Sequence, residues 1–192
     1  MAFSHWEYFQ AIEKDFVAHT RSIGYASNYY SVRSRELGKI ILASGSGIET
    51  TLDLTCRSIA PGERPASIAD YYPIVTGKYP GITKCRILLP SYNMALTPWQ
   101  EWTGGHAPKW WEGYLALRED LETGFREANY WNALYATAGL LCAILYYNRE
   151  IHGRSSGIAP DLAPRVFQPT RYVKRTGLVP GWSYSLPEDA AG

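Results

Sequence analysis

The chain has 192 residues, and its 19 lysines and arginines nearly balance its 18 aspartates and glutamates, for a formal net charge of +1. This balance gives no overall field that would favour nucleic acid or a membrane surface. The length suits one well-cored domain with an appendage. Three scattered cysteines are too few for a disulfide framework or a zinc site, and the first residues lack a signal-peptide pattern. We therefore expect a reduced, cytoplasmic protein without a metal or cofactor.

Two helices are predicted in the first third of the chain. Ser4 and Glu7 have the spacing of a capping box, and the helix that they start has a plausible stop at Gly24. A second, longer helix starts at Asn28 or Ser31 and ends before a Pro-Gly pair. Its apolar stripe consists of Leu37, Ile41, Ile48 and Leu52.

The middle of this second helix, Ala-Ser-Gly-Ser-Gly at 43–47, has weak helix propensity. It lacks the Gly-Lys-Ser/Thr ending of a phosphate-binding loop. The pattern favours a close approach between helices, or a kink, over contact with a ligand.

Shorter elements are predicted between the second helix and the centre of the chain. Ser67 is placed to cap a helix over residues 68–79. Two β-leaning runs, at 84–89 and 92–96, are joined across a Pro-Ser pair and predict a small hairpin.

The stretch 126–150 is the segment around which the rest of the chain is organised. It carries no charge between Glu127 and Arg149 and is apolar nearly all round, which predicts a helix buried on most sides. The preceding helix begins at Lys109 and either continues into the stretch 126–150 or breaks near Gly124.

A membrane anchor through residues 128–147 is the alternative for this stretch, because its length would suffice to span a bilayer. Asn129, Asn132 and Thr137 lie inside the run, together with alanines and a glycine that suit close helix packing. These residues favour a buried helix of a soluble protein.

A family resemblance begins at the Trp-Trp pair 110–111 and Tyr114. The helix that follows keeps a recognisable frame in Phe125, Ala128, Asn129, Asn132, Ala133 and Leu134. This frame resembles the HEPN (higher eukaryotes and prokaryotes nucleotide-binding) superfamily, and more closely a group of small bacterial proteins within it. The opening residues 5–9 fit the same group, so the resemblance spans roughly residues 4–150.

The resemblance implies an all-α, antiparallel helical bundle over residues 1–152, with the hairpin as a short insertion, and it implies a homodimer. Active members are metal-independent endoribonucleases of toxin and antiviral systems, with a cation and a histidine at the dimer cleft. The cation stabilises phosphorane-like charge, while the imidazole moves protons. Residues 153–192, rich in proline and glycine, are expected to form an extended or partly disordered tail unless they pack on a partner protein.

The motif that would carry this chemistry is altered. Leu115, Arg118, Glu119 and Leu121 stand where the group has Asn, Lys, His and Arg. Arg118 keeps the positive charge. Glu119, at the histidine position, is a poor general acid because the ordinary pKa of a glutamate is about 4.3. We therefore expect a catalytically degenerate, dimeric scaffold that binds RNA, a nucleotide or a partner, in a bacterial defence or toxin module. The alternative is an endoribonuclease that combines Arg118 with a relocated histidine.

The candidate site residues follow from this frame. The catalytic positions are Arg118 and Glu119, and the residues expected to line a cleft or bind a ligand are Trp111, Tyr114, Asn129, Asn132, His106 and His152. The two asparagines are expected to organise a buried hydrogen-bond network or to line the cleft. The two histidines either reach the cleft in a dimer or are exposed loop and helix-end residues.

A modest basic strip on the second helix is a further candidate for RNA contact. Arg33, Arg35 and Lys39 lie near Tyr29 and Tyr30, and aromatic rings interleaved with cations can stack on single-stranded bases. A solvated helix face is the alternative explanation for three charges.

Overall fold

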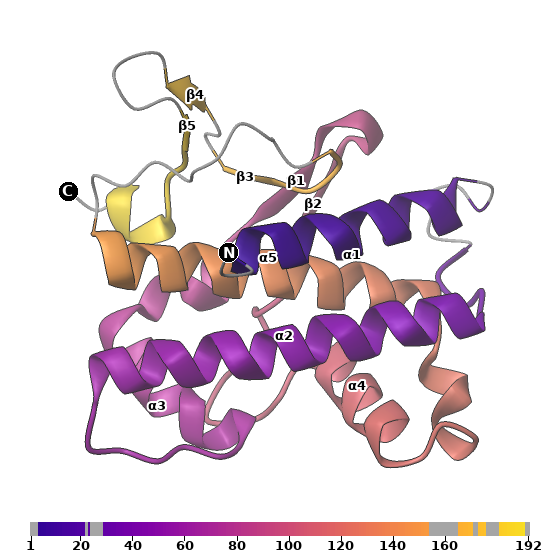
Figure 1. Cartoon of the computed structure of the whole chain (residues 1–192), viewed down its shortest axis with the longest axis horizontal. Coiled ribbons are helices and arrows are strands. Elements are labelled where there is room, and N and C mark those ends of the chain that lie inside the picture. Colours follow the sequence, from indigo (N-terminus) through magenta and orange to yellow (C-terminus); the bar gives the residue numbers. More distant parts are fainter. Residues whose placement is uncertain are drawn as a thin grey trace.

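The computed structural model describes residues 4–21, 23, 29–153, 165–170, 173–175 and 181–190, which are mostly helical (Figure 1). The α-helices are α1 (His5–Thr20), α2 (Arg35–Ile59), α3 (Ile68–Lys78), α4 (Lys109–Glu119) and α5 (Tyr130–His152). The strands are β1 (Ile87–Leu89), β2 (Met94–Leu96), β3 (Gln168–Pro169), β4 (Val173–Arg175) and β5 (Gly181–Ser183). Short 3₁₀ helices are η2 (Pro80–Lys84), η3 (Pro90–Tyr92), η4 (Thr123–Glu127) and η5 (Pro187–Ala190).

Side-chain caps decide where the first helices begin. The predicted capping box is confirmed, since Ser4 Oγ accepts from the Glu7 amide at 3.1 Å and Glu7 Oε2 accepts from the Ser4 amide at 3.0 Å. The proposed stop at Gly24 lies outside the described residues. The predicted start of the second helix was wrong, because Ser34 Oγ accepts from the Leu37 amide at 3.1 Å and α2 therefore begins at Arg35.

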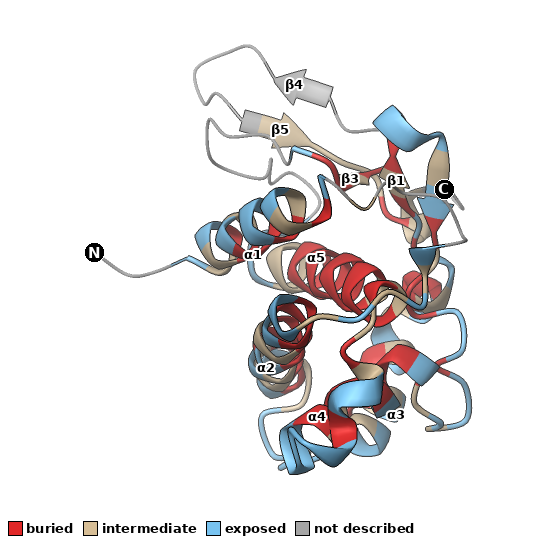
Figure 2. Cartoon of the chain, turned by 90° about the vertical axis from the view of Figure 1, so that its right-hand side faces the viewer, coloured by how far each residue is buried: buried red, intermediate tan, exposed pale blue. Residues whose placement is uncertain are grey.

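Helix α5 forms the centre of the core, and Figure 2 shows it almost wholly buried between the other elements. Helix α1 covers it on one side and α2 on another, while α4 and the sheet close further sides. In the described part of the chain, no helix is long and apolar enough to cross a membrane, and this includes α5, on which the anchor hypothesis depended.

The direction of α2 relative to α5 differs from the antiparallel bundle that the resemblance implied. The start of α2 pairs with the start of α5 through a bridge between Arg33 and Asn129, and their ends meet where Ser58 Oγ donates to Glu150 at 2.9 Å. The two longest helices are therefore parallel. This is possible because residues 60–129 return the chain to its starting end before α5 begins. Helix α1 is antiparallel to both (Figure 1).

The small residues at 43–47 allow helices to approach closely, as predicted, and α2 passes through this segment as one continuous helix. A Cβ atom on Gly45 would lie 2.2 Å from the ring of Tyr114 in α4. A Cβ atom on Gly47 would lie 2.7 Å from the ring of Tyr8 and 3.0 Å from Leu140 in α5. Larger residues at these two positions would therefore push α4, α1 or α5 away from α2.

The predicted hairpin is confirmed and belongs to a larger sheet. Strands β1 and β2 are antiparallel, with Ile87 opposite Leu96, and Asn93 takes the left-handed conformation (φ 51°) in the connection. The sequence did not predict β3, which pairs with the other edge of β1 and places Pro169 opposite Ile87. The strand order β2-β1-β3 thus brings the C-terminal part of the chain onto the bundle.

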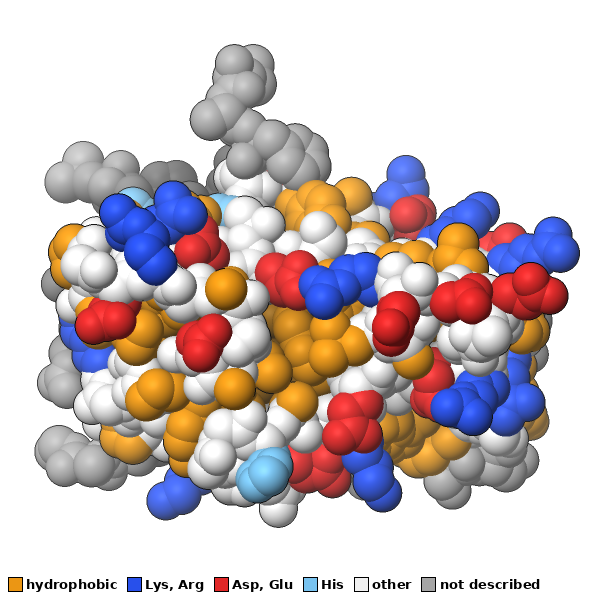
Figure 3. Space-filling view, turned by 90° about the horizontal axis from the view of Figure 1, so that it is seen from below, with side chains coloured by type: hydrophobic (Ala, Val, Ile, Leu, Met, Phe, Trp, Pro, Cys, Tyr) orange, Lys and Arg blue, Asp and Glu red, His pale blue; other side chains and the backbone are white. Residues whose placement is uncertain are grey.

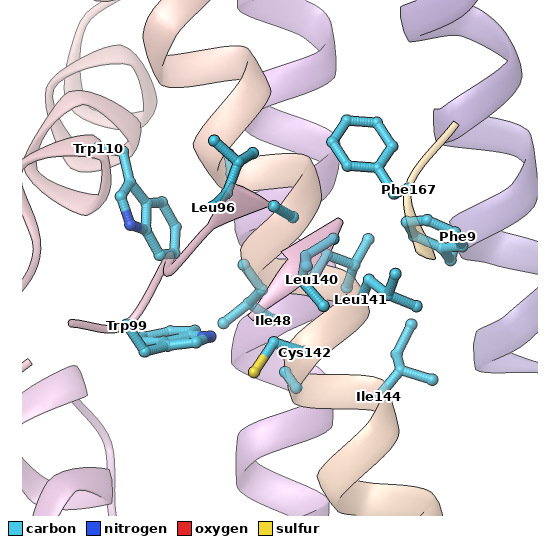
Figure 4. Packing of buried hydrophobic residues seen from close by; sticks show 14 of the residues in the cluster. Phe9, Ile48, Leu96, Trp99, Trp110, Leu140, Leu141, Cys142, Ile144 and Phe167 are labelled. Carbon is cyan, nitrogen blue, oxygen red and sulfur yellow. The ribbon is translucent and has the colours of Figure 1, made fainter. Parts of the chain in front are cut away.

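The described C-terminal residues 165–170 and 181–190, here called the C-terminal strap, are held first by Glu13 of α1. This carboxylate is only 1% exposed and accepts from the amides of Arg165, Val166 and Phe167 at 2.8, 2.8 and 3.0 Å. Burial raises the pKa of Glu13, and the three N–H donors oppose the rise. The Phe167 ring is fully buried and packs edge-on against Phe9 (Figure 4).

The other end of the strap binds the last turns of α5. Tyr184 donates to the Leu145 carbonyl at 2.7 Å, and Tyr146 donates to Glu188 Oε2 at 3.0 Å. Arg149 and Asp189 form a two-bond ion pair, each bond 2.7 Å long. Residues 165–170 and 184–189 of the expected tail thus pack on the bundle itself, which the sequence did not predict.

Replacing Glu13 with alanine is expected to destabilise the protein by at least about 2 kcal/mol. Two buried N–H groups, those of Val166 and Phe167, would lose their acceptor, and each such loss costs on the order of 1–3 kcal/mol. Asp15→Ala, on the exposed face of the same helix, is the matched control and should leave stability within about 0.5 kcal/mol of wild type. Urea unfolding followed by circular dichroism measures both. Equal stability of the two variants would contradict this role of Glu13.

Candidate functional site

The start of α5 is fixed by local capping and by the segment before α2. Asn129 Oδ1 accepts from the Asn132 amide at 2.9 Å and caps the helix. The amides of the first two residues of α5 are also occupied. Tyr130 N–H donates to the Val32 carbonyl at 2.9 Å, and Trp131 N–H donates to the Tyr30 carbonyl at 3.2 Å. The free N–H groups that usually bind anions at a helix start are therefore already used here.

Helix α4 ends at Glu119 and α5 begins at Tyr130, so of the two alternatives that the sequence left open the structure has the break near Gly124. Residue Gly124 in η4 packs against the backbone of α4, and a Cβ atom there would lie 2.5 Å from the Ala116 carbonyl oxygen. This close turn sets α4 beside the first turn of α5. A hollow of about 570 Å³ remains between them.

We call this space the α4–α5 hollow. Its wall combines residues from the segment before α2, from α4, from η4 and from the first turn of α5. The lining residues are Tyr30, Ser31, Arg33, Lys109, Glu112, Gly113, Ala116, Arg126, Glu127, Asn129, Trp131 and Asn132.

The charges in the hollow are mixed, with three cations and two carboxylates. Arg33 and Lys109 are exposed and form no ion pair in the described part of the chain. Arg126 lies 3.4 Å from Glu127, but 77% of its side chain is exposed, so water screens this pair strongly. All three cations are therefore accessible to an anionic ligand.

Aromatic rings form a second part of the wall. The half-buried Trp131 ring stacks on Tyr135, with centroids 4.5 Å apart and an interplanar angle of 29°. The half-buried Tyr30 ring is held by Tyr130 in the core, at a centroid distance of 6.1 Å. Both rings are thus held in place by neighbours while keeping some accessible surface.

The two asparagines combine both roles that the sequence left open. Asn129 caps α5, and the buried Asn132 donates through Nδ2 to the Glu127 carbonyl at 2.9 Å and to Glu127 Oε2 at 3.1 Å. Both also line the hollow. Their bonds orient the Glu127 carboxylate and fix the shape of the wall.

Arg118 lies on a different flank of α4, facing α2. It forms an ion pair with Glu49 and lies over the ring of Tyr114, with the guanidinium carbon 5.3 Å from the ring centroid. Tyr114 donates to the same carboxylate, Glu49 Oε2, at 3.0 Å. The cation expected to stabilise a phosphate is therefore already paired within the chain.

The protonation of this group argues against proton transfer. Burial raises the pKa of Tyr114 to about 12, and the Glu49 carboxylate adds to the rise. Burial tends to lower the pKa of Arg118, but the bonds to Tyr114 and Glu49 outweigh it and raise the pKa. Both side chains remain protonated at neutral pH, so neither serves as a general base there.

Glu119, the other predicted catalytic position, is exposed. It lines a smaller hollow that shares Ala116 and Arg126 with the α4–α5 hollow. The structure thus separates the two predicted catalytic residues, with Arg118 facing α2 and Glu119 turned towards η4.

The predicted histidines are exposed and lie away from Arg118 within the chain. His106 precedes the start of α4, and nine residues, roughly 14 Å of helix rise, separate Lys109 from Arg118. His152 lies in the last turn of α5, beside Glu150, which contacts Ser58 at the end of α2. No described contact joins either histidine to Arg118 or Glu119.

Trp111 and Tyr114 belong to the core and do not line a cleft within the chain, since they are only 1% and 2% exposed. The Trp111 ring packs against Trp99 and Trp110, with centroids 6.4 and 5.7 Å away. Figure 4 shows the neighbouring indoles of Trp99 and Trp110 directed towards α5. These residues therefore position α4 and its flanks.

Several residues of the α4–α5 hollow were not predicted from the sequence, namely Lys109, Glu112, Arg126 and Trp131. Arg33 and Tyr30 were predicted as part of a basic strip, but the structure divides that strip. Lys39 lines a separate groove between α1 and α2. On the face seen in Figure 3, basic and acidic side chains are interspersed and form no continuous basic patch.

Comparison of the chain with protein-family models, with curated proteins and with solved structures found no match. Within the described residues, no three His, Cys, Asp or Glu side chains gather in a way that could hold a metal ion.

The contact between Gly45 and Tyr114 gives a direct test of how α4 is held. Gly45→Ala is expected to destabilise the protein by about 1–3 kcal/mol, because the added methyl group would overlap the buried Tyr114 ring. Gly77→Ala in α3 is the control, since no atom lies within 4 Å of its added Cβ. It should stabilise the protein by up to about 1 kcal/mol through higher helix propensity. Thermal unfolding measures the midpoint temperature of both variants. Equal shifts of that temperature in the two variants would contradict the close approach of α2 and α4 at Gly45.

Proposed function

We propose that this chain is a catalytically degenerate HEPN-type protein that binds single-stranded RNA or a nucleotide in the α4–α5 hollow, within a cytoplasmic bacterial defence or toxin module. The observation that carries the proposal is the hollow itself, which places accessible cations beside rings that can stack on bases. The resemblance between residues 4 and 150 and the HEPN frame supports the same class of ligand.

Phosphate and base would be held by different parts of the wall. Arg33, Lys109 and Arg126 supply the charge-assisted hydrogen bonds that phosphate oxygens accept. Trp131 offers a ring face for a base, and such stacking contributes on the order of 1–3 kcal/mol per base. The mixed charges of the wall limit the ligand to a short stretch of backbone rather than a long duplex.

The paired state of Arg118 favours binding over cleavage. A nuclease of this family needs a free cation and a proton-transfer group at one place. Here the cation is paired with Glu49 and lies over the ring of Tyr114, and the histidine position holds the exposed Glu119.

Self-association is part of the proposal, because the resemblance implies a dimer. Leu121 and Phe125, in the turn between α4 and α5, are 64% and 42% exposed. Two large apolar side chains on the surface beside the hollow support a contact with a second copy there. Light scattering during gel filtration tests this, with Leu121→Asp expected to shift a dimer towards monomer.

The binding test uses labelled single-stranded RNA in EDTA, with complexes and products separated on native and denaturing gels. Arg33→Ala and Trp131→Ala should each weaken binding at least about tenfold, the loss expected for one phosphate or stacking contact. Arg35→Ala is the control, an exposed cation two residues away that does not line the hollow. With three phosphate contacts, the logarithm of the binding constant should fall with the logarithm of salt concentration with a slope of about −2.

Binding that is equal in the Arg33 and Arg35 variants would refute the hollow as the site. The alternative function, a metal-independent endoribonuclease, predicts cleavage of the RNA in the same reactions. Cleavage that disappears in Arg118→Ala would establish this alternative and overturn the proposal.

A further inference from the structure

A second hollow lies where the C-terminal strap meets the chain just before β1. It has a volume of about 210 Å³, less than half that of the α4–α5 hollow. Its lining residues are Lys84, Cys85, Arg86, Thr170, Ser185, Leu186 and Pro187. We call it the strap hollow, because one wall comes from residues 84–86 and the other from the strap.

Two cations face this space without a carboxylate in its wall. Lys84, the last residue of η2, and Arg86 stand on either side of Cys85, and both line the hollow. Cys85 between them points inward and is only 3% exposed. Neither cation forms an ion pair or side-chain hydrogen bond within the described part of the chain.

The nearest carboxylates of the strap are engaged elsewhere. Glu188 accepts from the Gly81 amide at 2.8 Å and from Tyr146 at 3.0 Å. Asp189 is held by the two bonds from Arg149. The strap therefore docks beside Lys84 and Arg86 without neutralising them, and their charge is left for a ligand.

We propose that the strap hollow binds a small phosphate-bearing anion. The lysine and arginine supply charge-assisted hydrogen bonds, and the Ser185 hydroxyl supplies a donor from the strap. Thr170 donates to the Arg86 carbonyl at 3.3 Å and holds this part of the backbone in place. The small volume suits a phosphate group or a compact phosphate ester better than a nucleotide.

Such an anion would join two segments that are far apart in the sequence. A ligand that binds only the folded arrangement stabilises it in proportion to its concentration, so the anion would strengthen the docking of the strap. The site is separate from the proposed RNA site. Leu145, which binds the strap, lies thirteen residues, about 20 Å of helix rise, from Asn132 in the α4–α5 hollow.

The test is calorimetric titration of the whole chain with inorganic phosphate, pyrophosphate and ribose 5-phosphate, at constant ionic strength set with chloride. Wild type should bind at least one of them at a single site. The double variant Lys84→Ala/Arg86→Ala should bind at least tenfold more weakly, and Ser185→Ala should also weaken binding. Tighter binding of inorganic phosphate would identify the free ion, whereas tighter binding of ribose 5-phosphate would identify an ester.

The control is Lys14→Ala/Arg64→Ala, which removes two exposed cations that lie outside the strap hollow. This control variant should bind the ligand with the same affinity as wild type does. The proposal would be overturned if wild type bound none of the three ligands, or if the two double variants lost affinity equally. A second readout is hydrogen exchange of the Ser185 amide, which bonds to the Thr170 carbonyl and should slow when ligand is added.

Discussion

The burial of α5 is the constraint on which the rest of the structure depends. A helix with no charge between Glu127 and Arg149 must be covered on nearly every side, because each exposed apolar face costs about 25 cal/mol per Å². No single neighbour can cover it. The chain supplies α1, α2, α4, the small sheet and the C-terminal strap, and each of them contacts α5 or packs beside it.

The parallel packing of α2 and α5 links this core to the proposed site. Because both helices start at the same end, the segment before α2 meets the cap of α5 through the pairing of Arg33 with Asn129. That meeting brings Tyr30 and Arg33 beside Trp131, with Lys109 of α4 on the facing wall. An antiparallel pair would have placed these residues at opposite ends of the bundle.

Local signals in the sequence predicted most elements, whereas contacts distant in sequence were missed. The Ser4 and Ser67 caps and the hairpin depend on neighbouring residues and were predicted, while the break near Gly124 was one of two alternatives that the sequence left open. The start of α2 was missed because Ser31 and Ser34 are equally good caps in the sequence alone. The docking of the strap on Glu13 was missed because its partners are backbone amides, which leave no side-chain pattern. The α4–α5 hollow was missed for a similar reason, since four separate segments build it.

Hydrogen exchange of the whole chain, with and without a short single-stranded RNA, would measure both the burial of α5 and the binding of RNA in the α4–α5 hollow. Exchange should be slow in α5 and at the Val166 and Phe167 amides under both conditions. RNA should slow exchange further in residues 29–33, 109–116 and 126–132, which surround the α4–α5 hollow. Protection centred on Arg118 and Glu49 instead, or no change with RNA at any concentration, would contradict the binding of RNA in this hollow.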